Sequence, residues 1–292
     1  MSSIEMRVTV PSAFKEMEKN IEDGMNGKPS TRCLHTGYNS IDENAEGGMR
    51  KGGVYWLSGE EGTGKTSLKC NIVNRILAAG GKVASLTLEM TINDELEKMT
   101  SIFAGNSVSR AIRGKGVIMP EALKKAKELI VQSGRFFLVD QSTVATTTGL
   151  WSFARRMVSK YKIDLLTIDY LQLLKVEHSN KMSGEEEVAE QSKCVKDIAG
   201  ILQIPVLCVA AINAQGKVRY SRQADYDGAG HWQLSREDEN PPGPPEYTQN
   251  INLFTKKARF GIPFVNLPFK LYGTTGLFEE RMKDNGEEKA ES

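Results

Sequence analysis

The stretch Gly59-Glu60-Glu61-Gly62-Thr63-Gly64-Lys65-Thr66 fits the pattern G-x-x-x-x-G-K-S/T and decides how the rest of the chain is interpreted. An apolar run at 54–57 precedes it, and a helix-like segment at 67–77 follows it. Glycines let the backbone curl so that successive N–H groups point at one phosphate, and the N-terminus of the next helix adds its positive end. The stretch therefore predicts a binding site for a nucleoside triphosphate.

Individual roles follow from this pattern. The Lys65 ammonium is expected to reach the β- and γ-phosphates, and the Thr66 hydroxyl is expected to ligate Mg²⁺. We therefore expect ATP and Mg²⁺ as cofactors, whereas an ordinary glycine-rich turn before a helix would need neither. The expected nucleotide-binding residues are Gly59, Glu60, Glu61, Gly62, Thr63, Gly64, Lys65, Thr66 and Ser67.

Composition is that of an ordinary globular protein. The 292 residues are 39% hydrophobic and 26% charged, and no apolar run approaches the roughly 20 residues that span a bilayer. The four cysteines form no C-x-x-C pair, so neither a zinc site nor a disulfide framework is expected. A net charge of +1 gives no overall basic field and leaves a nucleic-acid partner open.

From residue 36 onward, apolar strand-like runs alternate with amphipathic segments, which predicts an α/β fold with a mostly parallel twisted sheet and helices on both faces. We expect an arm and a linker helix at 1–30, one ATPase domain at 31–279 and a disordered tail at 280–292. The segment 215–245 is expected to be a long loop. The expected strands are 54–58, 83–89, 136–140, 165–169, 206–211, 251–255 and 264–271. The expected helices are 65–77, 92–103, 120–132, 147–161 and 185–202.

A further helix is predicted at 12–25, with Ser12 as its N-cap. Phe14, Met17, Ile21 and Met25 recur at helical spacing and form one apolar stripe. A linker-like run at 26–30 separates this helix from the rest. It could pack on its own domain or dock on a neighbouring subunit, and the sequence leaves both open.

Two predicted strands end in carboxylates. Asp169 follows the run 165–168, and in a parallel sheet that end faces the ligand crevice, where the carboxylate can hold the water shell of Mg²⁺. Glu89 follows 85–88 and could serve as the base for the attacking water, or could instead cap the helix that begins near Thr91. Position alone leaves both roles of Glu89 open.

Two basic runs could contact phosphates. Lys257 and Arg259 could stabilise charge on a γ-phosphate in their own or a neighbouring subunit, or could form a solvated turn. Lys217, Arg219 and Arg222 surround an aromatic residue, a set that can track a nucleic-acid backbone or simply form a wet surface.

Together these residues resemble the ATPase domain of replicative DNA helicases of the DnaB type, on a RecA-like fold, over about residues 10–280. The run 37–42 with Gly47-Gly48 resembles the family's entry motif. Leu88-Glu89-Met90 resembles its S-L-E-M, and the run 169–173 resembles its D-Y-L-Q-L. Lys257-Ala258-Arg259 before Gly261 resembles its K-x-R-x-G.

The resemblance implies a ring, a hexamer in the family, that hydrolyses ATP, moves 5′ to 3′ on single-stranded DNA and unwinds duplex DNA. It implies that Glu89 is the catalytic base, that Lys65 also serves catalysis, and that Lys257 and Arg259 are fingers acting on the neighbour's ATP. The helix at 12–25 would dock on the adjacent subunit. A primase or a helicase loader is an implied partner, and the implied location is the cytoplasm or a viral or organellar replication compartment.

Two departures from the family keep alternatives open. The family has a helical N-terminal domain ahead of the linker helix, whereas here that helix is predicted from residue 12, so we expect the ATPase half alone. Where the family reads S-Q-L-N, this chain has Ala210-Ala211-Ile212-Asn213, with Ala211 in place of the γ-phosphate-sensing Gln. The alternatives are a RecA-like recombination ATPase and an ATP-binding assembly or loading factor with slow hydrolysis.

Overall fold

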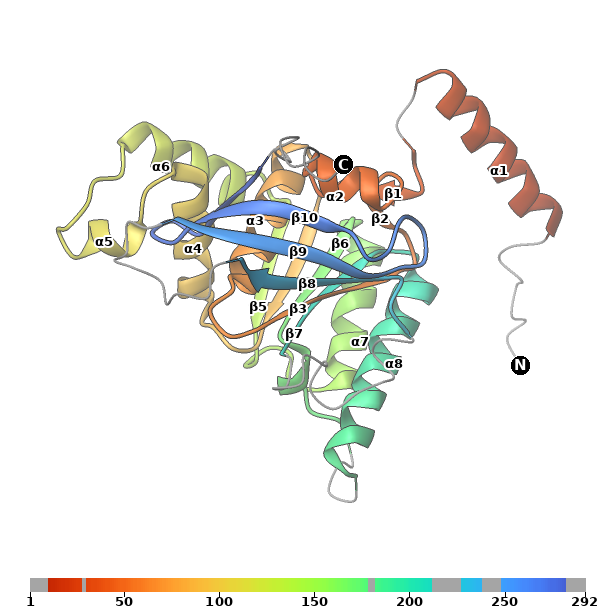
Figure 1. Ribbon diagram of the computed structural model, residues 1–292. Helices are drawn as coiled ribbons and strands as arrows, with labels where there is room; N and C mark the ends of the chain where they lie inside the picture. The colour runs from red at the N-terminus through yellow and green to blue at the C-terminus, as the bar shows by residue number, and fades with distance from the viewer. Residues whose placement is uncertain (1–9, 28–29, 178–181, 212–226, 238–247, 282–292) are drawn as a thin grey trace, which may run out of the picture.

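A nine-stranded sheet with helices on both faces forms the body of the protein (Figure 1). The computed structural model describes residues 10–27, 30–177, 182–211, 227–237 and 248–281. The strand order is β11-β10-β9-β8-β3-β7-β6-β4-β5, and β1 and β2 form a separate two-stranded sheet. Every pairing from β8 to β5 is parallel, whereas those of β8, β9, β10 and β11 with one another are antiparallel. The predicted α/β class with a mostly parallel sheet is confirmed.

The strands of the main sheet are β3 (Val54–Gly59), β4 (Val83–Thr87), β5 (Phe136–Asp140), β6 (Leu165–Asp169), β7 (Val206–Ala211), β8 (Gly230–Arg236), β9 (Thr248–Ala258), β10 (Asn266–Tyr272) and β11 (Leu277–Glu280). The small sheet consists of β1 (Cys33–Leu34) and β2 (Met49–Arg50). All residues of β3, β4 and β6 are buried, as expected for strands covered on both faces.

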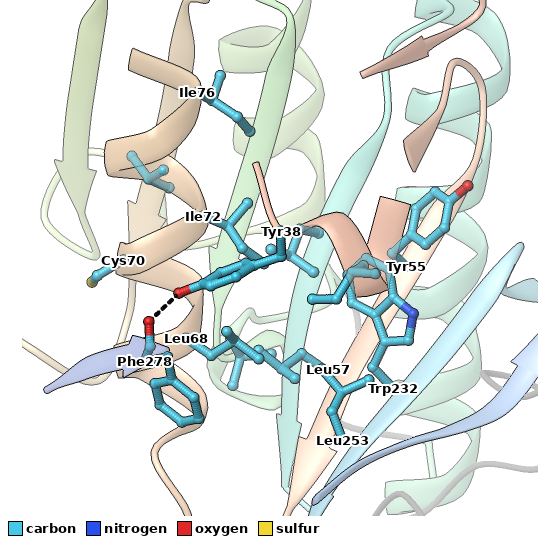
Figure 2. Packing of buried hydrophobic residues seen from close by; sticks show 14 of the residues in the cluster. Tyr38, Tyr55, Leu57, Leu68, Cys70, Ile72, Ile76, Trp232, Leu253 and Phe278 are labelled. Carbon is cyan, nitrogen blue, oxygen red and sulfur yellow. Dashed lines mark hydrogen bonds between the residues drawn. The ribbon is translucent and has the colours of Figure 1, made fainter. Parts of the chain in front are cut away.

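Alternation along the central strands divides the buried side chains between two cores. In β3, Tyr55 and Leu57 join one core, while Val54 and Trp56 join the other. Figure 2 shows the first core, in which Leu68 and Ile72 of α3 lie beside Tyr38 and Leu57. The Tyr38 hydroxyl donates a 3.0 Å hydrogen bond to the Phe278 carbonyl. This bond joins the segment before the phosphate loop to the last strand.

Helices cover both cores. The first core lies under α3 (Lys65–Ala78), α4 (Ile92–Ala104), α6 (Pro120–Lys127) and the π-helical turn η1 (Glu128–Gln132). The second lies under α7 (Thr147–Arg156), the π-helical turn η2 (Met157–Tyr161) and α8 (Gly184–Leu202). The shorter helices are α2 (Asn39–Asn44), α5 (Val108–Ile112) and the 3₁₀ turn η3 (Leu171–Leu173). Capping boxes at Thr91 and Ser183 fix where α4 and α8 begin.

Two strands contradict the sequence predictions. Strand β8 lies inside the segment predicted to be a long loop, because its pairing partners β3 and β9 supply the order that its polar sequence does not indicate. The predicted tail at 280–292 is wrong at its first residue, since Glu280 belongs to β11 and pairs with Phe269. Charged residues of this kind are common on edge strands, where they discourage pairing with other chains.

Some strands and helices begin or end at residues other than those predicted. Strand β4 ends at Thr87, so Glu89 lies beyond the strand, and β10 begins at Asn266 instead of 264. Helix α1 (Val10–Met25) includes Ser12 in its first turn, so Ser12 is not its N-cap. Figure 1 shows α1, in red, standing apart from the sheet, and none of its residues is buried. Within the described ranges, no helix combines the length and apolar character needed to cross a membrane.

Candidate active site

The phosphate loop connects the end of β3 to the first turn of α3, as predicted. Gly64 is the N-cap of α3 and has a left-handed backbone, with φ 88° and ψ 23°. A Cβ atom at this position would lie 2.9 Å from the Phe278 ring and 3.0 Å from the Leu271 side chain. Glycine is therefore required here by both backbone conformation and space. Inside the loop, the buried Thr63 hydroxyl donates to the Glu60 carbonyl at 2.8 Å and fixes the turn.

Substituting Gly64 by Ala should destabilise the protein by about 1–3 kcal/mol and weaken nucleotide binding, because the loop must move away from Phe278. Thermal unfolding and fluorescent-nucleotide titration measure the two effects. Gly105→Ala is the matched control, since Gly105 also has a positive φ (67°) but has no atom within 4 Å of the added Cβ. Unchanged nucleotide affinity in Gly64→Ala would contradict the steric argument.

The Lys65 ammonium lies over the loop. Its Nζ donates to the carbonyl oxygens of Gly59 and Glu60, each at 2.8 Å. Burial lowers the pKa of Lys65 below its usual range, and the Asp169 and Glu89 carboxylates oppose that shift. Asp169 lies at the end of β6 and Glu89 lies just after β4. The carboxylates of both strands are therefore at the same end of the parallel strands as the phosphate loop.

Asp169 and Glu89 differ in exposure. Asp169 ends β6 and is 2% exposed, whereas Glu89 lies two residues beyond β4 and is exposed. The strands are in register at Thr87 and Asp169, and the Leu88 N–H donates to the Asp169 carbonyl at 2.6 Å. Although Glu89 is exposed, partial desolvation of its carboxylate and, next, the nearby Asp169 carboxylate raise its pKa, while Lys65 opposes the rise. The cap alternative for Glu89 is not what the structure shows, because Thr91 and Asp94 form the capping box of α4.

Arg236 also reaches this edge, and the sequence analysis did not identify it. It is the last residue of β8, and its Nη2 donates to the Glu61 carbonyl of the phosphate loop at 3.3 Å. The available signal was the apolar alternation of Trp232 and Leu234, followed by a cation two residues later. That pattern lies within 215–245, the segment predicted to be a long loop.

Lys257 and Arg259 lie at the end of the strands opposite to the phosphate loop. Ala258 pairs with Gly230, which in turn pairs with Tyr55, near the start of β3. The phosphate loop begins at the other end of that strand, about 13 Å away at the usual rise per residue. Arg259 is exposed and lines a hollow of about 390 Å³. The structure therefore does not bring Arg259 to the phosphate loop of its own chain.

The turn that follows Arg259 is held against α2. The Asn44 side-chain amide donates to the Ile262 carbonyl at 2.9 Å, and the Ile262 N–H donates to the Asn44 carbonyl at 3.1 Å. The Arg50 guanidinium stacks over the Phe260 ring at 3.9 Å. A Cβ at Gly261 would lie 2.1 Å from the Asn44 carbonyl oxygen, so this close approach requires glycine.

The remaining candidates cannot be placed. Lys217, Arg219 and Arg222 lie outside the described residues, as does Asn213. Ala211 ends β7, but nothing is described of its side chain. The nucleic-acid contacts and the substituted sensor position therefore stay predictions from the sequence.

A family model and several curated proteins that resemble this chain indicate the same family of helicases. The family model described as DnaB-like helicase C terminal domain matches residues 33–225. A probable plasmid replicative DNA helicase of Chlamydia psittaci is 31% identical over 184 residues, which cover 62% of this chain and 39% of that protein. The replicative DNA helicase DnaB of Geobacillus stearothermophilus is 24% identical over 208 residues, or 70% of this chain and 45% of that protein. The chain thus spans less than half the length of these curated relatives.

Solved structures support the fold. One of them is described as an ATPase domain, and it superposes with a TM-score of 0.78 at 17% sequence identity, covering 94% of this chain and 99% of that chain. A structure described as a DnaB-like replicative helicase and its interactions with primase superposes with a TM-score of 0.75 at 18% identity. The match covers 93% of this chain and 66% of that chain. At these identities the likeness establishes a common fold.

Proposed function

The chain belongs to the DnaB-like helicase C-terminal domain family, and we propose that it is an ATP-driven DNA helicase motor that assembles as a hexameric ring. The observation that carries the proposal is the arrangement of Lys65, Asp169 and Glu89 at one edge of the sheet. A cation for the phosphates, a buried carboxylate and an exposed carboxylate of raised pKa are the groups that ATP hydrolysis requires.

We propose Mg²⁺ as the metal, held by Thr66 and Asp169. The donor set fits, because Mg²⁺ commonly takes one or two carboxylates and keeps several waters and substrate phosphates as its other ligands. Neither oxygen of Asp169 receives a hydrogen bond from the residues that the structure describes, although the carboxylate is buried. When bound, the metal would neutralise charge on the phosphates. Lys65 would hold the same phosphates, and Glu89 would accept the proton of the attacking water.

Arg259 and Lys257 are proposed to act on the ATP of a second copy of the chain. Their position about 10–13 Å along the strands from the phosphate loop, and two strands away from β3, makes an action within one chain unfavourable. Their turn is fixed to α2 through Asn44 and Gly261, so the finger would be presented without further ordering. A site completed by a neighbour is a head-to-tail contact, and such contacts generate a ring when the rotation between successive subunits closes.

Helix α1 supports the same assembly. Val10, Phe14, Ile21 and Met25 are among its exposed apolar side chains, and α1 stands apart from its own body (Figure 1). We propose that this apolar stripe docks on the adjacent subunit. Single-stranded DNA is the proposed track, with Lys217, Arg219 and Arg222 as proposed contacts, and a primase or helicase loader is a proposed partner.

The test of the proposed function is ATP hydrolysis with and without single-stranded DNA, at low and moderate salt, together with the particle mass. We expect a ring-sized particle whose turnover rises with DNA and whose DNA response weakens as salt increases. Lys65→Ala is the control, and it should remove turnover in both conditions. A monomer with little turnover that is indifferent to DNA would contradict the proposal and favour an ATP-binding assembly factor; an open filament would favour a recombination ATPase.

A further inference from the structure

A buried lysine beside the proposed metal site is not explained by the nucleotide-binding motif. Lys69 follows Lys65 by one turn of α3, and its side chain is 0% exposed. Its Nζ lies 2.9 Å from Oε2 of Glu95 and 3.2 Å from Oδ2 of Asp169. Lysines are almost never fully buried unless they are paired, and here one ammonium lies between two carboxylates.

The contacts of Lys69 form part of a closed polar network. Oε1 of Glu95 accepts a 2.8 Å hydrogen bond from the Ser85 hydroxyl, which itself accepts one from the Thr167 hydroxyl at 2.8 Å. The network therefore connects α3, α4, β4 and β6. These elements carry or adjoin Lys65, Glu89 and Asp169, so the network fixes the three proposed site residues relative to one another.

Core stability alone is the simpler explanation for such a cluster. However, replacing a buried ion pair by well-packed apolar residues is often neutral or stabilising, so stability is a weak reason for these charges. The geometry at Asp169 suggests a different role. Lys69 makes an ion pair with Oδ2, off the line of a hydrogen bond, and Oδ1 has no partner among the described residues. One oxygen of Asp169 is thus held and the other is available.

We propose that Lys69 is a positioning residue for Asp169, which it holds through Oδ2 so that Oδ1 is the oxygen offered to the water shell of Mg²⁺. Without Lys69, the carboxylate would be free to rotate away from the phosphate loop. Glu95 keeps the Lys69 ammonium in place and balances its charge, so that Lys69 does not compete with the metal for Asp169. This inference rests on the proposed nucleotide and Mg²⁺ site.

The experiment compares two variants by titrating a fluorescent ADP analogue with and without Mg²⁺. Lys69→Met leaves Glu95 buried without its cation, whereas the double variant Lys69→Met/Glu95→Met removes both charges and should fold more stably. In both, the apparent affinity for Mg²⁺ should fall about 10- to 100-fold, as is typical when a group that orients a metal ligand is lost. Affinity for the nucleotide in EDTA should stay within about twofold, because Lys65 and the loop are unchanged.

Lys196→Met is the matched control, since Lys196 also pairs with a buried carboxylate, that of Asp227, at 2.6 Å on another part of the fold. It should not change the affinity for Mg²⁺. A double variant that folds and binds Mg²⁺ as tightly as wild type would overturn the inference, and so would a double variant that cannot fold, which would assign the cluster to core stability. A wild-type protein without Mg²⁺-dependent nucleotide binding would instead refute the proposed function.

Discussion

Glu89→Gln should lower the rate of ATP hydrolysis by about 10²- to 10⁴-fold while leaving nucleotide affinity nearly unchanged. Gln keeps the size of the side chain but cannot accept the proton of the attacking water. Glu89 is exposed and lies beyond β4, and Lys65 and the loop backbone that would hold the phosphates are unchanged in this variant, so we expect nucleotide affinity to change little. Steady-state hydrolysis and fluorescent-nucleotide titration of the same preparation separate the two effects. Equal losses in turnover and affinity would contradict a role as base.

The same residue predicts a pH dependence. Partial desolvation and the Asp169 carboxylate raise the pKa of Glu89 above its ordinary value of 4.5. A base must be deprotonated, so wild-type turnover should fall with decreasing pH at a pH above that value. The free energy of unfolding changes with pH in the opposite direction to turnover. A carboxyl whose pKa is raised in the folded state stabilises the fold at low pH, and this contribution is lost as pH rises through the folded-state pKa. Loss of Glu89 should therefore not destabilise the protein at neutral pH. An unchanged acid limb in the residual activity of Glu89→Gln would contradict this assignment.

Local patterns were enough to predict where those residues of the candidate site lie that are at strand ends. The phosphate loop, Asp169 and Glu89 each follow an apolar run, and in a parallel sheet those ends meet at one edge. Lys69 and Arg236 could not be found in this way. Lys69 looks like an ordinary polar position of a helix, and its role depends on Glu95 and Asp169, which are distant in sequence. Arg236 depends on β8, whose order comes from its neighbours in the sheet.

The position of Arg259 relative to its own phosphate loop also needed the fold. Sequence left open whether this guanidinium serves its own subunit or the next one. The register of β3, β8 and β9 places Arg259 near the start of β3, at the end of the strands that is remote from its own phosphate loop. Arg236 lies at the end of the strands that carries the loop and contacts Glu61. Two arginines that look equivalent as basic residues at strand ends are therefore separated by topology. This difference makes them a matched pair for experiment.

Arg259→Ala should reduce ATP turnover of the assembled protein by about 10³- to 10⁵-fold, the effect expected of an arginine finger. Its phosphate loop stays intact, so nucleotide affinity should change little. Lys65→Ala should also be inactive, but it keeps a normal Arg259. Mixing the two inactive proteins should restore activity, because about a quarter of the interfaces in a random one-to-one ring join an intact loop to an intact finger. Hydrolysis measured against mixing ratio tests this.

Arg236→Ala provides the control for that mixture. Arg236 contacts the phosphate loop of its own chain, so we expect Arg236→Ala alone to have low turnover through the same site as Lys65→Ala, and the turnover of each single variant is measured first. No interface in a mixture of these two variants combines an intact Lys65 with an intact Arg236 in one subunit, and activity should stay low. Recovery with Arg259→Ala but not with Arg236→Ala requires a finger that crosses between subunits. Recovery with neither would argue against an action of Arg259 on the neighbouring subunit, and recovery with both would mean that the Arg236 contact with Glu61 is not needed in the subunit that binds the ATP.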